Sequence, residues 1–158
     1  MFPIIPANSA AEDAGNQNGI FGFGHDGSSY VGMTNLVSDT GVVATDVAAV
    51  GTARASGAAC EFGGDTAIFA YGYNGSAYIS LSSLVSNSGV VASDVTGVGS
   101  IRAYLGACSF GEDKGIFGYG YTGSNVSMTN LVSNAGVVGT DVTGVGTARR
   151  SLAACSYN

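Results

Sequence analysis

The sequence is poor in charged residues, and above all in basic ones. Only 10% of its 158 residues are charged, against about 25% in typical soluble domains, and the basic residues are one lysine and four arginines. With a formal net charge of −6, the chain has no basic patch that could neutralise phosphates. We therefore expect neither nucleic acid nor an anionic membrane surface among its partners.

Proline, tryptophan and long apolar runs are also scarce. The chain has two prolines and no tryptophan, whereas glycine supplies 26 residues, a composition that suits short strands and tight turns. Residues 66–93 are uncharged, but Gly72, Gly75 and several serines interrupt the run, so it is no membrane-spanning helix. Residues 1–10 lack a basic region and an adequate apolar stretch, so we expect no signal peptide and no membrane insertion.

What the sequence does contain is one pattern written three times. Ile-Phe pairs begin at positions 20, 68 and 116, in steps of 48 residues. Leu-Val-Ser triplets and single aspartate, arginine and cysteine residues recur at steps of 48 and then 47. A period of about 40 to 50 residues in an all-β chain is the length of a propeller blade. Because such a unit cannot bury its own apolar face, we expect each unit to stack on its neighbours.

The second repeat shows the strand pattern most clearly. Alternation would place Phe69, Tyr71 and Tyr73 on one face of a strand, and Asn74-Gly75 is a strong hairpin signal. The sequence predicts an all-β fold in which each unit is a four-stranded antiparallel sheet. In the second repeat we expect strands over 56–62, 66–73, 77–85 and 90–98.

The order of these features resembles a kelch repeat. The resemblance covers residues 19–158 and is carried by RASGAACEFGGDTAIFAYGYNGSAYISLSSLVSNSGVV and RAYLGACSFGEDKGIFGYGYTGSNVSMTNLVSNAGVV. Two features depart from the kelch pattern: Gly-Tyr replaces the usual diglycine, at Gly72-Tyr73 and Gly120-Tyr121, and the tryptophan of the fourth strand is missing. The chain is thus similar to a divergent kelch-like group found in phage and marine viral structural proteins. Its opening, MFPIIPANSA, is similar to the start of phage tail-associated proteins.

The resemblance implies a β-propeller with three four-stranded blades in this chain. We expect a leader over 1–18, blades over about 19–53, 54–101 and 102–148, and a closing strand within 149–158. Propellers typically have roughly four to eight blades, so three cannot close a ring. The repeats begin at a second strand, 19–24, and end on a first strand, 151–157, so a homodimer would complete a six-bladed ring. A three-chain ring of nine blades is the alternative.

One aspartate and one arginine recur in every repeat. In a six-bladed ring the arginines would form a circle near one mouth of the channel. We expect them to pair with a repeated acid such as the aspartate set, the alternative being a site for an anion or an acidic glycan. For the aspartates we expect capping of turns or of backbone N–H groups, the alternative being a ring that binds cations or sugars. The two sets are Asp46, Asp94 and Asp141, and Arg54, Arg102 and Arg149.

The three cysteines occupy one equivalent position in the repeat. Cys60, Cys108 and Cys155 fall in the small-residue strand that we expect innermost in each blade. A disulfide needs Cα atoms within about 7 Å, which equivalent strands of successive blades do not satisfy. We therefore expect free, buried thiols that pack on the inner strand, compatible with synthesis in a reducing compartment.

The remaining polar residues match no catalytic or metal motif. His25, the only histidine, lies beside Asp26 without a nucleophile, so we expect a surface turn residue. Acidic turn residues such as Glu61 and Asp65 lack the spacing of a calcium loop. We expect no enzyme activity, no metal and no cofactor. The aromatic residues that we expect to pack between blades are Phe21, Phe23, Phe69, Tyr71, Phe117 and Tyr119.

Two functions follow from this pattern. The first is a non-catalytic structural or interaction module of a phage virion or tail, made in the host cytoplasm, that binds its own second copy and another virion protein. The second is a sugar-binding propeller that holds a host-surface glycan weakly at each blade junction and gains avidity by repetition. The absence of tryptophan argues against the second, although Tyr30 and Tyr78 are able to stack on a sugar.

Overall fold

The structure, a computed structural model, describes residues 17–157 and contains, over this range, eight β-strands in three antiparallel sheets. The all-β prediction is confirmed. We call residues 17–53, 54–101 and 102–148 units 1, 2 and 3. The expected leader, 1–18, lies outside the described residues except for its last two positions. Nowhere in 17–157 is there a helix of the length and apolar character needed to cross a membrane.

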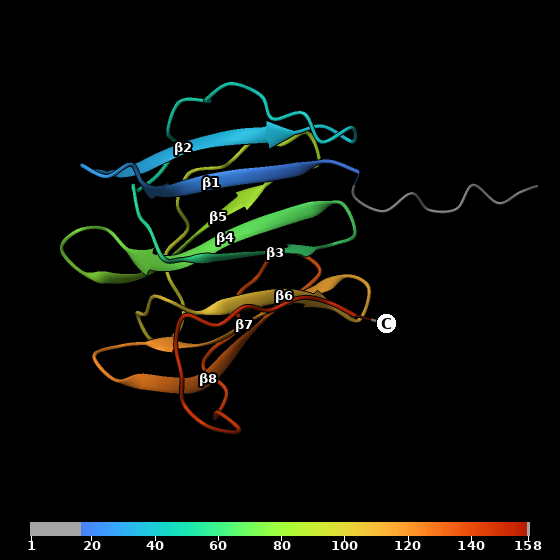
Figure 1. Cartoon of the computed structure of the whole chain (residues 1–158). Coiled ribbons are helices and arrows are strands. Elements are labelled where there is room, and N and C mark those ends of the chain that lie inside the picture. The colour runs from blue at the N-terminus through green and yellow to red at the C-terminus, as the bar shows by residue number, and fades with distance from the viewer. Residues whose placement is uncertain (1–16, 158) are drawn as a thin grey trace, which may run out of the picture.

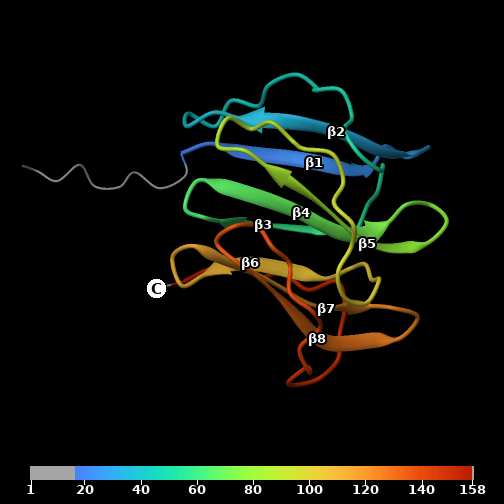
Figure 2. The ribbon, with the colours of Figure 1, turned by 180° about the vertical axis from the view of Figure 1, so that it is seen from behind.

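The three sheets follow the repeat along the chain. Figure 1 shows them stacked in chain order, with unit 1 at one end and unit 3 at the other. In the view from behind, Figure 2, the segment after β5 passes along the stack toward β6. Unit 1 contains β1 (Gly19–His25) and β2 (Tyr30–Val37), unit 2 contains β3 (Ala58–Phe62), β4 (Thr66–Tyr73) and β5 (Tyr78–Val85), and unit 3 contains β6 (Gly106–Phe110), β7 (Lys114–Tyr121) and β8 (Asn125–Val132).

The hairpin predicted at Asn74-Gly75 joins β4 to β5. The side-chain Oδ1 of Asn74 accepts the N–H groups of Ser76 and Ala77, each at 2.9 Å, and Gly75 has φ = 96°. A side chain at Gly75 would be strained at this φ, which explains why glycine follows the asparagine. The turn brings Tyr73 opposite Tyr78 and so sets the register of the two strands.

Each unit carries a β-bulge at an aromatic residue, in β1, β4 and β7. In β4 the register shifts between Ala70 and Gly72, and Tyr71 between them has φ = 62°. Phe23 in β1 and Tyr119 in β7 have φ of 62° and 63° at the equivalent bulges. One extra residue in a strand turns the side chains that follow to the opposite face.

The bulge overturns the prediction that Phe69 and Tyr71 share a face. The Phe69 ring packs edge-on against Phe23 of unit 1, with ring centroids 5.3 Å apart. The Tyr71 ring packs against Phe117 of unit 3, at 5.4 Å. The two aromatic residues of β4 therefore contact different neighbouring units and link all three sheets.

The expected fourth strand is present only as two isolated bridges in each unit. In unit 2 these join Val91 to Val85 and Val95 to Ser82. Between the two bridges, β5 advances by three residues and the segment opposite it, 91–95, advances by four. One extra residue therefore interrupts the ladder of backbone hydrogen bonds. The same spacing recurs in units 1 and 3, so the prediction of a continuous strand over 90–98 is wrong.

The expected closing strand, 151–157, has no strand assignment in the single chain. It nevertheless lies beside β6: the Ser151 N–H donates to the Tyr104 carbonyl at 2.8 Å, and the Ser156 hydroxyl donates to the Ser109 carbonyl at 2.9 Å. A second strand along its other edge is absent from the described residues. The segment therefore lies where a first strand is expected, but within the described residues it lacks the ladder of backbone hydrogen bonds that would define a strand.

The core lies between the units rather than within them. Ile68, Tyr71 and Phe117 are fully buried in the cluster that joins units 2 and 3. Equivalent residues at the ends of the stack are exposed: the accessible fraction is 63% for Phe21 and 9% for Phe69, which occupy the same repeat position. Stacking therefore buries the aromatic and apolar residues at the junctions between units and leaves their equivalents on the two outer faces accessible.

The three thiols are free, but only one of them is buried. Cys60 is covered by unit 3, and burial raises the pKa of its thiol to about 12, so it stays protonated at neutral pH. Cys108 is half-buried and Cys155 is exposed. The prediction of three buried thiols is therefore wrong at Cys108 and at Cys155, and no unit lies against Cys155 within the described residues.

Burial between units predicts unequal effects for one substitution at two positions. Val132→Ala removes two methyl groups from a side chain that is 1% exposed, so it should lower the free energy of unfolding by about 2 kcal/mol. Val90→Ala, at a position 65% exposed, should change it by less than about 0.5 kcal/mol. Urea unfolding of the two variants measures both effects, and equal losses would contradict this packing.

Candidate functional site: arginine clamps between the units

Arg54 joins unit 1 to unit 2. Its guanidinium lies over the Phe23 ring of unit 1, 3.9 Å from the centroid, and its Nη1 lies 3.1 Å from Oδ1 of Asp94 in unit 2. Nη2 donates to the Ser83 hydroxyl at 2.9 Å. With only 2% of the side chain exposed, the charge depends on these partners in place of water. We call this arrangement of ring, arginine and carboxylate a clamp.

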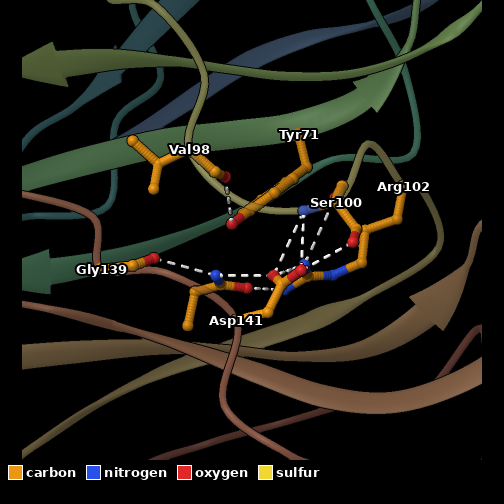
Figure 3. Close-up of polar contacts among 7 residues, drawn as sticks. Tyr71, Val98, Ser100, Arg102, Gly139 and Asp141 are labelled. Atoms are coloured by element: carbon orange, nitrogen blue, oxygen red, sulfur yellow. Dashed lines mark hydrogen bonds and ion pairs between the residues drawn. The ribbon is translucent and has the colours of Figure 1, made fainter.

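Arg102 builds the same clamp between units 2 and 3 (Figure 3). Its guanidinium lies 4.2 Å from the centroid of the Tyr71 ring, and its Nη1 lies 3.6 Å from Oδ1 of Asp141. Nη2 donates to Oδ1 of Asn130 at 2.5 Å, and the amide of Asn130 donates to Asp141 at 3.0 Å. Arg102 is completely buried. The repeat therefore joins both pairs of neighbouring units in one way.

The backbone fixes each clamp at two further points. The Thr52 N–H donates to Oδ2 of Asp94 at 2.6 Å, and the Ser100 N–H donates to Oδ2 of Asp141 at 3.0 Å. The bulge glycine Gly72 donates its N–H to the carbonyl of Arg102 at 2.9 Å. The strained bulge thus places the aromatic ring and holds the arginine backbone beside it.

The clamps lower the pKa of both carboxyl groups. Partial burial by itself would raise the pKa of Asp94, but the hydrogen bonds from Thr52, Ser83 and Arg54 outweigh it and hold the pKa below its usual value. Asp141 follows the same balance, with Ser100, Asn130 and Arg102 as its partners. Both side chains are therefore ionised at neutral pH, as the ion pairs require.

Within residues 17–157, the third arginine and the first aspartate of the repeated sets have no such partners. The Arg149 guanidinium lies 4.0 Å from the centroid of the Tyr119 ring, but its only hydrogen bond among the described residues is to the Thr147 carbonyl, at 3.3 Å. From this part of the chain Asp46 receives one hydrogen bond, from the Asn35 amide at 2.7 Å. Both side chains are exposed. Arg149 and Asp46 are therefore the two halves of a clamp at opposite ends of the stack.

A second cluster, a row of aromatic rings that are half-buried except for the exposed first ring, crosses all three units at the β-hairpin ends. Neighbouring centroids lie 4.8 to 5.8 Å apart. The guanidinium of Arg150 lies 4.3 Å from the last ring. We call this row the aromatic ladder; its rings are His25, Tyr30, Tyr73, Tyr78 and Tyr121.

His25 has a structural place at the start of the ladder. Its ring packs on Tyr30 and its Nδ1 accepts the N–H of Gly27 at 3.1 Å, in an exposed turn. Across residues 17–157, no three His, Cys, Asp or Glu side chains gather in a way that could hold a metal ion. The polar residues that do converge are those of the clamps.

Several clamp residues recur at the repeat spacing but are not among the residues that we selected from the sequence. A polar residue of the third strand occurs as Asn35, Ser83 and Asn130, and a hydroxyl residue precedes each arginine by two positions, as Thr52, Ser100 and Thr147. The recurrence of these residues at spacings of 48 and 47 is the signal in the sequence that could have identified them. The aromatic partners were expected to pack between blades, and their stacking on the arginines was not anticipated.

Comparison with known proteins supports only the fold. No family model and no curated protein sequence matches the chain. Its structure is similar to that of a fungal alcohol oxidase of the AA5 family in complex with copper, with a TM-score of 0.53 and 13% identity. The match covers 77% of this chain and 27% of the oxidase, so the chain corresponds to about a quarter of that protein's length.

The clamp predicts that its buried arginine contributes much more to stability than its exposed equivalent. Arg102→Ala should lower the free energy of unfolding by about 2–4 kcal/mol, since it leaves Asp141 and Asn130 without their buried partner. Arg149→Ala, measured on the dilute single chain, should cost about 1 kcal/mol or less. Denaturant unfolding measures both, and a small effect at Arg102 would contradict the clamp.

The lowered carboxyl pKa values predict a loss of stability in acid. A carboxyl group whose folded pKa lies below its unfolded value, here 3.8, contributes stability that is complete above that value and is lost as the pH falls through the folded pKa. The free energy of unfolding should therefore be constant from pH 7 to about 5 and fall below about pH 4. Asp94→Asn, less stable at pH 7, should show a shallower fall. An equal slope in that variant would exclude Asp94 as a source of the effect.

Proposed function

We propose that this chain is a non-catalytic structural and interaction module built as half of a kelch-like β-propeller. Each unit is a blade, and two copies of the chain form a closed ring of six blades. The observation that carries this proposal is the clamp, which recurs with the same parts at both junctions between units. A joint that repeats between identical units is what a ring of blades requires.

The outer faces of the stack support closure. Phe21 on the open side of unit 1 is 63% exposed, whereas Phe69 and Phe117 at the same repeat position are 9% and 0% exposed. On the open side of unit 3, Phe110 is 42% exposed, against 6% for its equivalent Phe62. Apolar faces of this kind favour association, and a two-fold dimer is the commonest closed assembly.

The use of the polar residues supports a role without catalysis. Arg54 and Arg102 are paired with Asp94 and Asp141 and stack on an aromatic ring of the preceding unit, which leaves these residues in structural roles at the internal junctions. With the resemblance to phage and marine viral repeats, we place the module in a virion or tail, made in the host cytoplasm, where it binds another virion protein through the faces of the ring.

The mass in solution tests the ring. Light scattering on a size-exclusion column should give about 31 kDa, twice the 15.6 kDa of the chain, at micromolar concentration. A mass near three times the chain would replace the six-bladed ring with the nine-bladed one. A monomer would contradict the proposal.

The aromatic ladder favours glycan binding as a second candidate function. Tyrosine rings and hydroxyls, partly accessible in one row across the units, offer faces for sugar rings and groups for hydrogen bonds. A glycan array should then show saturable binding that Tyr78→Ala reduces at least about tenfold, a loss of about 1.4 kcal/mol. Val90→Ala, at an exposed position outside the ladder, is the control. An array without binding would exclude this function and leave the structural role.

A further inference from the structure

We infer that the two ends of the described chain are complementary halves of one joint, and that a second copy of the chain supplies the missing half at each end. This inference rests on the proposed ring. Arg149 of one copy pairs with Asp46 of the other, and residues 151–157 of one copy lie along β1 of the other. We call this contact the seam.

The first half of the seam is a clamp without its carboxylate. Arg149 already stacks on Tyr119 as Arg54 stacks on Phe23, and Gly120 donates its N–H to the Arg149 carbonyl at 3.0 Å, as Gly24 does to Arg54 at 2.8 Å. The ring and the backbone contact are thus built as in a complete clamp. What Arg149 lacks is an aspartate from a following unit.

The second half is a carboxylate without its arginine. Asp94 and Asp141 each form an ion pair with an arginine and accept a hydrogen bond from a backbone N–H of the preceding unit's connection. Within residues 17–157, Asp46 accepts only from Asn35. Asn35 holds the place of Asn130, the partner of Arg102. Unit 1 therefore presents the same pair of groups, an amide and a carboxylate, that unit 3 presents to Arg102. The negative charge of Asp46 complements the positive charge of Arg149.

The segments that connect the units make the same backbone contact in each repeat, as far as Ser151. The Tyr104 N–H donates to the Ser56 carbonyl at 2.7 Å, and the Ser151 N–H donates to the Tyr104 carbonyl at 2.8 Å. Ser56, Tyr104 and Ser151 all have positive φ, between 55° and 58°. Residues 151–157 thus lie against β6 as β6 lies against β3, in the position of the first strand of a following unit.

Unit 1 has a vacant place for that strand. A groove of about 310 Å³ follows the edge of β1 that has no strand partner in residues 17–157, and it lies between Ile20–Gly24 and Arg54–Ala59. In unit 2 the equivalent edge of β4 is occupied by β3. The groove therefore lies where a first strand belongs, and 151–157 of a second copy is the segment with the matching sequence.

The registers of units 2 and 3 fix how the strand would sit. Cys60 pairs with Ile68 and Cys108 pairs with Ile116. By the same register, Cys155 lies directly opposite Ile20 of the second copy. Residues directly opposite on antiparallel strands have Cα atoms about 4.5–5.5 Å apart, within the range of roughly 4.4–6.8 Å that a disulfide spans, so cysteines there are close enough to be joined.

A pair of charge reversals tests the clamp half of the seam. Arg149→Glu and Asp46→Arg change exposed side chains, so each chain should keep its fold by circular dichroism. Each variant alone places like charges at both seams and should weaken dimerisation at least about 100-fold. An equimolar mixture should restore the dimer, because one seam then pairs the two introduced side chains, which carry opposite charges, and the other seam keeps Arg149 with Asp46.

Controls make the same charge changes away from the ends. Lys114→Glu alters the exposed first residue of β7, Asp65→Arg alters an exposed residue of the turn that precedes β4, and both variants should remain dimers. If Arg149→Glu and Asp46→Arg each dimerise like the controls, or if their mixture stays monomeric, the seam is overturned. A wild-type monomer would instead overturn the ring itself, so the two failures are distinct.

A disulfide tests the strand half. Ile20→Cys should form an interchain disulfide with the native Cys155 and give a covalent dimer on non-reducing gels, which Cys155→Ser in the same chain abolishes. The matched control, Ile116→Cys, places its thiol opposite Cys108 of the same chain and should give no covalent dimer. If oxidised Ile20→Cys protein is a dimer in solution but runs as a single chain on the non-reducing gel, residues 151–157 do not lie along β1 of the second copy and the strand exchange is wrong.

Discussion

The structure depends on a buried guanidinium that belongs to two units at once. Arg54 and Arg102 are almost inaccessible to water, and a buried charge without partners is strongly unfavourable. Each finds an aromatic ring in the preceding unit and a carboxylate in its own. Because arginine offers a planar face for stacking and several donors at its rim, one side chain can make both contacts. The order and spacing of the sheets follow from these paired contacts.

The clamp in turn requires the bulge. A tyrosine or phenylalanine at positive φ costs about 1–3 kcal/mol, yet β1, β4 and β7 all contain such a residue at the equivalent repeat position. The bulge turns Tyr71 toward unit 3 while Phe69 stays toward unit 1. In a strand of ordinary alternation, two residues at this spacing would point to the same neighbour. The polar contacts of the clamp and the apolar packing between the units together offset the strain of the backbone.

The repeat predicted the sheets well because strand and turn signals are local. β4 has the bounds that its alternation indicates, and Asn74-Gly75 forms its turn. The neighbouring unit that Tyr71 contacts could not be predicted, since nothing in a Tyr-Gly pair distinguishes a β-bulge from a regular strand. The partner of each arginine depends on which units are adjacent in space, and the interrupted fourth strand depends on one extra residue facing β5. Both are properties of stacked units rather than of any one segment.

If one joint serves every junction, the contact between two copies has the geometry of the internal clamps. A crystal structure of the assembled protein tests this most directly, through the distance between the Arg149 guanidinium of one copy and the Asp46 carboxylate of the next. We predict an ion pair within about 4 Å at two seams related by a two-fold axis, with Arg149 stacked on Tyr119. An assembly in which these groups lie apart, or face solvent, would contradict a joint shared by all the junctions.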